Sequence, residues 1–600
     1  MSALLSPHRN LTPWKQVVSP ATVLMCVASF LQLSFAQSSS AQASANRSAI
    51  YARGVSALQH RDLTTAREAF EKVVKLSPGN ADAQNYLGWV LLAQGEVENA
   101  IPHFRAALAV KPKLAQAHIN LASALEHQGK LPDAATELRL ALKISPLDVQ
   151  AHRALGRVRS LQGNLPTAVV ELRRATQLAP RQAVLHDELG SLLAQQHEFE
   201  NAQKEFLQAL RLDPRSAPSH LHLGVALWEQ KKIDPAISEL RTATRLAPND
   251  FKNRYYLGKV LEDKGDHASS IVELQEAVKL QPGAAEAHKL LGLALQRSGD
   301  ASAALASYRA VLKLQPDDPE AHNDLGLALL QNGDAGNAIT EFRAALALRP
   351  EDVGFRTNLG VAFLQKTDFN AAIREFQEGL KLAPEHASLH YDLGLAFKLK
   401  DQLPQAIAEW QKALSLDPGL ADAHYTLGVT YWQQGNFPQA AEHMRAAVRA
   451  KPDYAEAFYT LGTVLKQQGN LPDAVSALRE AIRLHPDFAG AHTTLAAVLR
   501  QQGDLPGAQA ESRAAQELTR TQTNSQAARF SLNSGNRLLN AGDWDGAIMQ
   551  FQTAIKLAPA NALPHYQLAL ALRHKGQTAE ARAEFDKAVT LDPKLQPPPE

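Results

Sequence analysis

The chain has 600 residues, 45% of them hydrophobic, so it is long enough for more than one core and too apolar for a disordered polymer. Its 62 basic and 61 acidic residues leave a formal net charge of +1, which gives no electrostatic signature of binding to nucleic acid or anionic lipid. A single cysteine, Cys26, excludes disulfide frameworks and cysteine-based zinc sites.

Residues 1–36 are typical of a secretory signal peptide. Two basic residues, Arg9 and Lys15, precede an uncharged and mostly apolar stretch that ends at Ala36, where small residues offer a cleavage site. We therefore predict an extracytoplasmic protein, periplasmic or secreted, with a short linker at 37–46. The alternative is an uncleaved segment that anchors the chain in a membrane.

From residue 47 onward the chain repeats one unit of 34 residues. Its clearest marker is a proline that recurs at this interval, at 78, 112, 146, 180, 214, 248, 282, 316, 350, 384, 418, 452 and 486, and again at 559 and 593. With that proline counted as position 32, fourteen units occupy 47–522 and two more occupy 528–595. Five inserted residues, 523–527, separate the two groups and predict a hinge, and 596–600 form a tail. The alternative for 523–527 is a slightly longer helix that keeps the repeats stacked.

Each unit carries the pattern of two helices. Positions 4, 7, 8 and 11 form one helix face, and positions 20, 24 and 27 form a second. Position 8 is glycine or alanine in all sixteen units, and position 24 is mostly large. Pairs such as Gly333-Asp334 separate the two faces, because glycine ends one helix and the acid caps the next. We expect two antiparallel helices in each unit.

With Leu-Gly at positions 7–8, Gly-Asp at 15–16, alanine at 20 and 27 and proline at 32, the unit resembles the tetratricopeptide repeat. The resemblance covers residues 47–595. It implies an all-α, right-handed superhelical α-solenoid of about sixteen helix–turn–helix units, in which the first helices line the concave surface. One unit cannot bury both of its apolar faces alone, so stability is expected to come from stacking on its neighbours.

Histidine occupies position 4 in ten units, a recurrence that raises the question of a metal or catalytic row. The residue three later is always leucine, whereas a metal pair on a helix needs His, Asp or Glu one turn away. We therefore expect packing between helices, with a hydrogen bond from the ring. No GxSxG, P-loop, HExxH or GxGxxG motif appears, so we predict no enzyme, no metal and no cofactor. The ten are His118, His152, His186, His220, His288, His322, His390, His424, His492 and His565.

A solenoid without catalytic residues is expected to bind ligands along its concave face, onto which first-helix positions 2, 5, 6, 9, 12 and 13 should point. Aromatic side chains with a polar tip are good anchors for peptides. The other interpretation is that these tyrosines only pack against the next helix. The candidate partner-binding residues are Tyr391, Tyr425 and Tyr459 at position 5, Trp432 at position 12, and Tyr255 and Trp228 at the same positions of earlier units.

These patterns predict a non-enzymatic scaffold that binds a protein or peptide on its concave face, in an extracytoplasmic assembly and without nucleic acid. Two alternatives stay open. One is a structural solenoid that associates with itself as a homo-oligomer. The other is a carbohydrate-binding module that stacks sugars on the aromatic row.

Overall fold

The computed structural model describes residues 36–595, and the regular structure in that part of the chain is entirely α-helical. Its 31 helices fall into two compact units, divided in sequence between Asn332 and Gly333, and each unit is described by itself. The predicted signal peptide, up to residue 35, and the tail at 596–600 lie outside the described residues. Within 36–595 no helix combines the length and the apolar character needed to cross a membrane.

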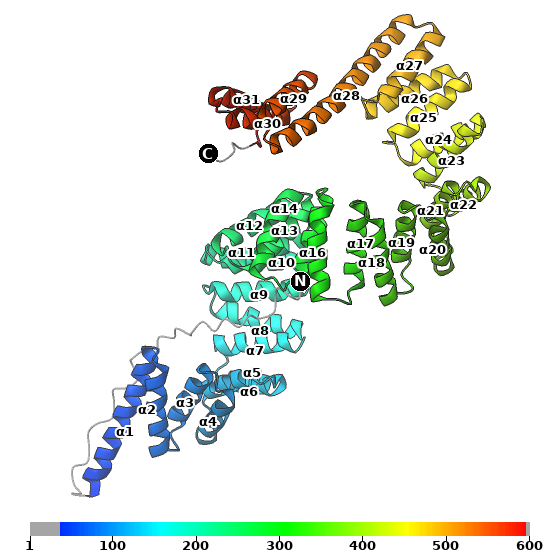
Figure 1. Cartoon of the computed structure of the whole chain (residues 1–600). Coiled ribbons are helices and arrows are strands. Elements are labelled where there is room, and N and C mark those ends of the chain that lie inside the picture. Colours follow the sequence, from blue (N-terminus) through cyan, green and yellow to red (C-terminus); the bar gives the residue numbers. More distant parts are fainter. Residues whose placement is uncertain (1–35, 596–600) are drawn as a thin grey trace. The chain divides into compact units, whose positions relative to one another are not determined.

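The first unit holds helices α1 to α17 (Figure 1). Their bounds are α1 (Ala36–Gln59), α2 (Leu63–Leu76), α3 (Ala81–Ala93), α4 (Val97–Val110), α5 (Ala115–His127), α6 (Leu131–Ile144), α7 (Val149–Leu161), α8 (Leu165–Leu178), α9 (Ala183–Gln195), α10 (Phe199–Leu212), α11 (Ala217–Glu229), α12 (Ile233–Leu246), α13 (Phe251–Lys264), α14 (His267–Leu280), α15 (Ala285–Arg297), α16 (Ala301–Leu314) and α17 (Pro319–Gln331).

The second unit holds helices α18 to α31. Their bounds are α18 (Ala335–Leu348), α19 (Val353–Gln365), α20 (Phe369–Leu382), α21 (Ala387–Leu399), α22 (Leu403–Leu416), α23 (Ala421–Gln433), α24 (Phe437–Ala450), α25 (Ala455–Gln467), α26 (Leu471–Leu484), α27 (Ala489–Gln502), α28 (Leu505–Asn540), α29 (Trp544–Leu557), α30 (Ala562–His574) and α31 (Thr578–Leu591).

Helices that follow one another pair as hairpins, and each hairpin packs on the next. Helices α1 to α16 make eight hairpins in the first unit. Helices α19 to α31 make seven in the second unit, because α28 is the second helix of one repeat and the first helix of the next. The predicted all-α solenoid of helix–turn–helix units, in step with the proline count, is thus confirmed.

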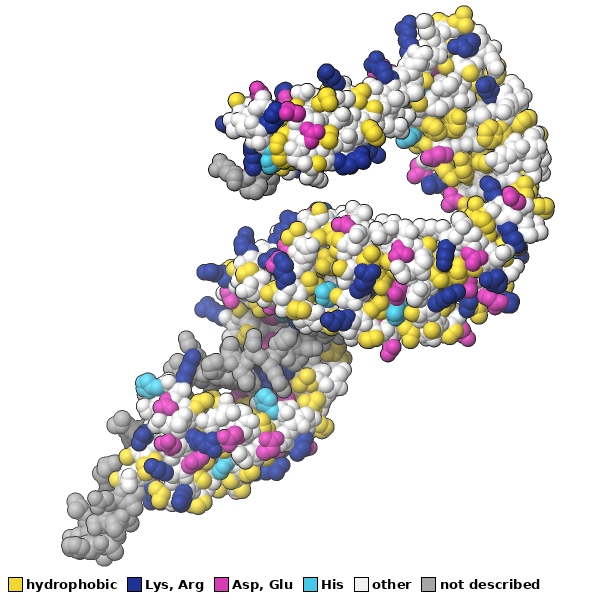
Figure 2. Space-filling model, in the orientation of Figure 1, with side chains coloured by type: hydrophobic (Ala, Val, Ile, Leu, Met, Phe, Trp, Pro, Cys, Tyr) yellow, Lys and Arg dark blue, Asp and Glu magenta, His cyan; other side chains and the backbone are white. Residues whose placement is uncertain are grey.

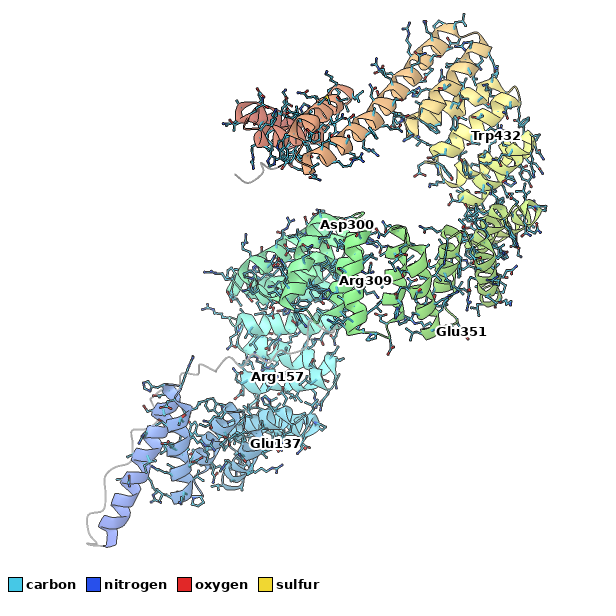
Figure 3. The ribbon with its side chains drawn as sticks, viewed as in Figure 1. Glu137, Arg157, Asp300, Arg309, Glu351 and Trp432 are labelled. Atoms are coloured by element: carbon cyan, nitrogen blue, oxygen red, sulfur yellow. The ribbon has the colours of Figure 1, made fainter. Side chains whose placement is uncertain are left out.

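The turns between the two helices of a repeat follow the expected chemistry. Gly299 has a left-handed backbone, with φ +92°, and Asp300 then accepts a hydrogen bond from the Ala303 amide at 2.9 Å at the start of α16 (Figure 3). The same left-handed conformation is kept where the turn residue is not glycine. Those five positions are Arg61, His197, Lys231, Thr367 and Asp401, with φ between 59° and 62°.

The core of each hairpin depends on close approach between position 8 and position 24. A Cβ atom built on Gly190 would lie 2.7 Å from Cε1 of Phe206, a ring that is fully buried. The cores do not stop at one hairpin: in the first unit one apolar cluster runs from Ala57 to Val158, and in the second another runs from Ala406 to Ala508. Stability is therefore shared between neighbouring repeats.

Two stretches that the sequence predicts to be irregular are helical. Residues 37–46, predicted as a linker, lie in α1, and residues 523–527, predicted as a hinge, lie within the 36-residue helix α28. Neither stretch contains glycine or proline, so nothing in it stops a helix. Between Ala515 and Ala528 no residue of α28 is buried.

The position-4 histidines bridge the two helices of their repeat, which confirms the expected packing role and adds a partner that the sequence analysis missed. In seven repeats Nδ1 lies 2.5–2.7 Å from a glutamate carboxylate at position 23 of the second helix. In nine repeats Nε2 donates to the carbonyl of the preceding position-32 proline at 3.0–3.2 Å. The seven pairs are His118–Glu137, His152–Glu171, His186–Glu205, His220–Glu239, His390–Glu409, His492–Glu511 and His565–Glu584.

Position 4 is occupied by side chains that can donate hydrogen bonds. A carbonyl oxygen only accepts, so Nε2 of the histidine must donate to it. In two repeats arginine makes the same pair of contacts: Arg254 donates to Glu273 at 2.6 Å and to the Pro248 carbonyl at 3.2 Å. At Glu584 burial acts to raise the pKa of the carboxyl group, but hydrogen bonds from Lys587 and His565 outweigh it. The pKa of Glu584 is therefore lowered.

The repeat 421–454 breaks this rule. Its position 23 is His443, and Nδ1 of His424 lies 3.0 Å from Nδ1 of His443, while Nε2 of His424 donates to the Pro418 carbonyl. Burial lowers the pKa of both imidazoles, and His424 lowers that of His443 further. The neighbouring Glu442 opposes the shift in both rings, and Arg449 adds to it for His424. Two neutral rings can share one hydrogen bond, whereas two imidazolium ions repel each other.

We expect Gly190→Ala to destabilise the α9–α10 hairpin by about 1–3 kcal/mol, because the new methyl group overpacks Phe206. Hydrogen exchange of amides in α9 and α10, read together with thermal unfolding, measures the effect. Gly336→Ala is the matched control, because its Cβ meets nothing nearer than 3.8 Å in α18. Equal protection in the two variants would contradict the packing described here.

We expect His443→Glu to stabilise the α23–α24 hairpin at acid pH by about 1 kcal/mol, the net worth of a typical hydrogen bond. The pKa values of His424 and His443 are lowered in the fold, so the unfolded chain binds more protons, and stability falls as the pH drops below the ordinary histidine value. A carboxylate side chain at residue 443 removes this loss of stability at low pH. Hydrogen exchange in α23 and α24 at pH 5.5 and pH 7.5 measures it; the same pH response in both proteins would contradict the assignment.

Candidate functional site

Side chains at positions 5 and 6 of the first helices form a row of contacts from one repeat to the next. In each contact a position-5 residue meets the position-6 residue of the following repeat. Nδ2 of Asn120 donates to Oδ1 of Asn85 at 3.0 Å, and the Tyr391 hydroxyl lies 3.3 Å from the Thr426 hydroxyl. Three ionic contacts belong to the same row: Arg153–Glu188, Asp187–His222 and, at 3.8 Å, Lys289–Asp324.

A second row joins position 12 to position 13 of the next repeat. Nε1 of Trp228 donates to Asp263 at 2.7 Å, and Nε1 of Trp432 donates to Gln467 at 2.6 Å. Arg297 reaches the buried carboxylate of Glu262 at 3.1 Å. The two rows mark what we call the first-helix face, the surface predicted to be concave and to bind ligands.

The three position-5 tyrosines lie on successive first helices, α21, α23 and α25, and all are half-buried against one core. The ring centroid of Tyr425 lies 5.0 Å from that of Tyr454, and the centroid of Tyr459 lies 4.7 Å from that of Phe488. These rings therefore pack against the core and against neighbouring aromatic rings while remaining partly exposed. We call Tyr391, Tyr425, Tyr454, Tyr459 and Phe488 the tyrosine patch.

Tyr454 and Phe488 are absent from the sequence-based list. Both occupy position 34, the last residue before the next first helix, and each ring meets the tyrosine at position 5 of its own repeat. The signal was present in the sequence as an aromatic residue at position 34 of two consecutive units that also carry tyrosine at position 5. Its meaning depends on how the chain turns between repeats, which the sequence does not state.

The remaining candidates divide between the units. Trp432 lies on α23 and packs, half-buried, against the same core as the tyrosine patch (Figure 3). Trp228 and Tyr255 belong to the first unit, on α11 and α13. Lys259 covers the Trp228 ring with Nζ 4.9 Å from the centroid, and the Phe251 ring stacks on Tyr255 at 5.7 Å. The six candidates therefore form two separate sets, four residues in one unit and two in the other.

The face around the tyrosine patch is acidic on the side of Tyr391. Burial, together with Asp422 and Asp392, raises the pKa of the Tyr391 hydroxyl, despite the hydrogen bond to Thr426. Burial, Asp422 and the neighbouring Tyr425 and Tyr391 likewise raise that of Tyr454. These phenols stay protonated and can donate hydrogen bonds. Figure 2 shows acidic and hydrophobic side chains next to each other over α23 to α25.

The described residues offer little for catalysis. Between residues 36 and 595 no group of three or more His, Cys, Asp and Glu side chains is arranged to hold a metal ion. A surface hollow of about 530 Å³ between α27 and α28 is lined by polar side chains such as Thr493, Gln516 and Thr519. This hollow contains none of the candidate residues.

Models of the tetratricopeptide repeat match most of the chain. One of them matches residues 51–113, 94–149, 188–251, 232–285, 255–300, 289–353, 459–522 and 532–595. Four further models of the same repeat match 397–435, 421–454, 329–396 and 149–174. No curated protein matches the sequence significantly.

Solved structures similar to this chain share little sequence with it. Yeast Tom70 is 16% identical, with a TM-score of 0.37, over 76% of this chain and 96% of that one. A pilF protein of Pseudomonas aeruginosa is 22% identical, with a TM-score of 0.32, over 34% and 94%. MamA of Desulfovibrio magneticus RS-1 is 24% identical, with a TM-score of 0.27, over 28% and 96%.

The helical hairpins, their 34-residue register and the family match over more than half of the residues agree with one another. The chain belongs to the tetratricopeptide repeat family.

Proposed function

We propose that this protein is a non-enzymatic scaffold that binds an extended protein or peptide segment along the first-helix face, with the tyrosine patch as its main anchor. The observation that carries the proposal is the set of half-buried tyrosines on α21, α23 and α25, whose rings pack against one core, with the Tyr391 hydroxyl beside that of Thr426. Rigid aromatic side chains lose little entropy on binding, so they are favourable anchors.

Two further features support binding of a segment rather than of a small molecule. In the second unit, polar pairs such as Tyr391–Thr426 and Trp432–Gln467 join successive first helices beside the aromatic residues, and such groups can meet a partner's backbone repeat after repeat. The hollow between α27 and α28 is open and polar, unlike the enclosed apolar pockets that small ligands favour.

Replacing Tyr391, Tyr425 and Tyr459 together by alanine is expected to weaken partner binding about 100-fold or more, because each buried aromatic anchor contributes about 2 kcal/mol. Affinity capture from cell-envelope extract identifies the partner, and titration calorimetry measures its affinity. Tyr566→Ala is the matched control, because Tyr566 occupies position 5 of the last repeat, away from the patch.

Helical content and thermal unfolding of the triple variant show whether its repeats are intact. Equal binding by the natural chain and a folded triple variant would contradict the proposal. Capture of glycans in place of proteins would favour the carbohydrate-binding alternative. Assembly of the purified chain that the triple substitution disrupts would favour self-association.

We propose that the scaffold acts outside the cytoplasm, because residues 1–36 have the layout of a secretory signal. Residues 1–46 fused to a phosphatase that is active only after export are expected to give activity, and Leu24→Asp, which interrupts the apolar stretch, is expected to abolish it. An active fusion without the apolar stretch, or an inactive natural fusion, would contradict this localisation.

A further inference from the structure

Among the acidic residues at positions 5 and 6 of the described repeats, one has no partner in the adjacent repeat. Four acidic residues occupy these positions in the sixteen repeats: Asp187, Glu188, Asp324 and Asp392. The first three each face a basic residue of the adjacent repeat, as given above. Asp392, at position 6 of α21, makes no hydrogen bond or ion pair among the described residues.

The sequence explains why Asp392 has no partner. The position-5 residue of the preceding repeat is Thr357, where the paired acids at position 6 meet Arg153 or Lys289. The Thr357 hydroxyl donates its proton to the Val353 carbonyl of its own helix at 2.8 Å, so that proton is not available to a carboxylate. The pair of positions occupied by Thr357 and Asp392 therefore has an acidic residue but no basic residue.

The surroundings of Asp392 fit a cationic side chain. The carboxylate is partly buried, and burial alone raises the pKa of Asp392 to about 6. Tyr391 lies next to it on the same helix, and Asp422 adds a second negative charge close enough to act on Tyr391. A guanidinium group binds a carboxylate and stacks on an aromatic ring at the same time.

We propose that Asp392 and Tyr391 form a receptor for one arginine side chain of the bound segment, with the arginine supplying the cation that Thr357 does not. This inference rests on the proposed function, because it names the chemistry of the partner at one point of the same face. The bound guanidinium takes the place that Arg153 takes opposite Glu188, where Nε and Nη2 both donate to the carboxylate.

Short glycine–serine peptides with a single central arginine, or with citrulline of nearly the same shape in its place, provide the first test. The arginine peptide also carries a photoreactive group beside that residue. With the whole chain, we expect crosslinks to α21 and its neighbour α19, and binding at least about tenfold tighter for arginine than for citrulline, the effect of one charge-assisted hydrogen bond. Equal binding of the two peptides would overturn the receptor.

Two substitutions test the named residues. Asp392→Asn is expected to remove the preference for arginine without loss of folding, because it removes a partly buried charge that lacks a partner. Thr357→Arg is expected to block the site by completing the contact from within the chain. Glu188→Gln, at position 6 of an already complete contact, is the matched control and should leave peptide binding unchanged. Retained arginine preference in Asp392→Asn would overturn the assignment.

Proton release provides a readout that a purely structural role of Asp392 would not change. At pH 6 part of the Asp392 population is protonated, so a bound cation displaces a proton. The heat of binding should then depend on the ionisation enthalpy of the buffer, and it should not in Asp392→Asn. Buffer-independent heats in the natural chain would contradict the proposal.

These outcomes separate this inference from the proposed function. If the triple tyrosine variant loses the captured partner while Asp392→Asn binds it as well as the natural chain does, the scaffold function stands and the arginine receptor is wrong. If neither set of substitutions affects the captured partner, both proposals are wrong.

Discussion

The structure depends on close contact between a small residue at position 8 and a large residue at position 24. Gly190 against Phe206 shows how little room is left, because even a methyl group on the glycine would overlap the ring. This contact holds the two helices of a repeat at short range, and the constant length of 34 residues carries the same geometry to the next repeat. The contacts between positions 5 and 6, and between positions 12 and 13, recur because every repeat places these positions in the same geometry relative to the next repeat.

A second regularity joins the helices through charge. Histidine or arginine at position 4 reaches a glutamate on the second helix and the carbonyl of the proline that ended the previous repeat. One side chain thereby connects three segments of the chain. The repeat with His424 and His443 departs from this rule, and it also carries Tyr425 and Tyr454 of the tyrosine patch, so the expected acid sensitivity and the proposed binding site involve the same hairpin.

Much of the fold could be predicted from the sequence, because the period, the small residues and the turn glycines are all local signals. The glutamate partners of seven histidines could not, since the two residues of each pair lie 19 residues apart on different helices and only the packing brings them together. The contact of Tyr454 with Tyr425 could not be predicted either, for the same reason. Nor could the lack of a partner for Asp392, because that requires knowing which positions meet between repeats. At 523–527 the sequence left a hinge and a longer helix open, and α28 shows the longer helix, because none of the inserted residues stops a helix.

That continuity has a consequence for how the second unit comes apart. Elsewhere adjacent hairpins share buried side chains, so the loss of one removes support from the next. Between Ala515 and Ala528 no residue is buried, and the side-chain contacts are local ones such as the ion pair of Arg520 with Glu517. Local opening there breaks few contacts, and the repeats before and after it can therefore melt as separate cooperative blocks.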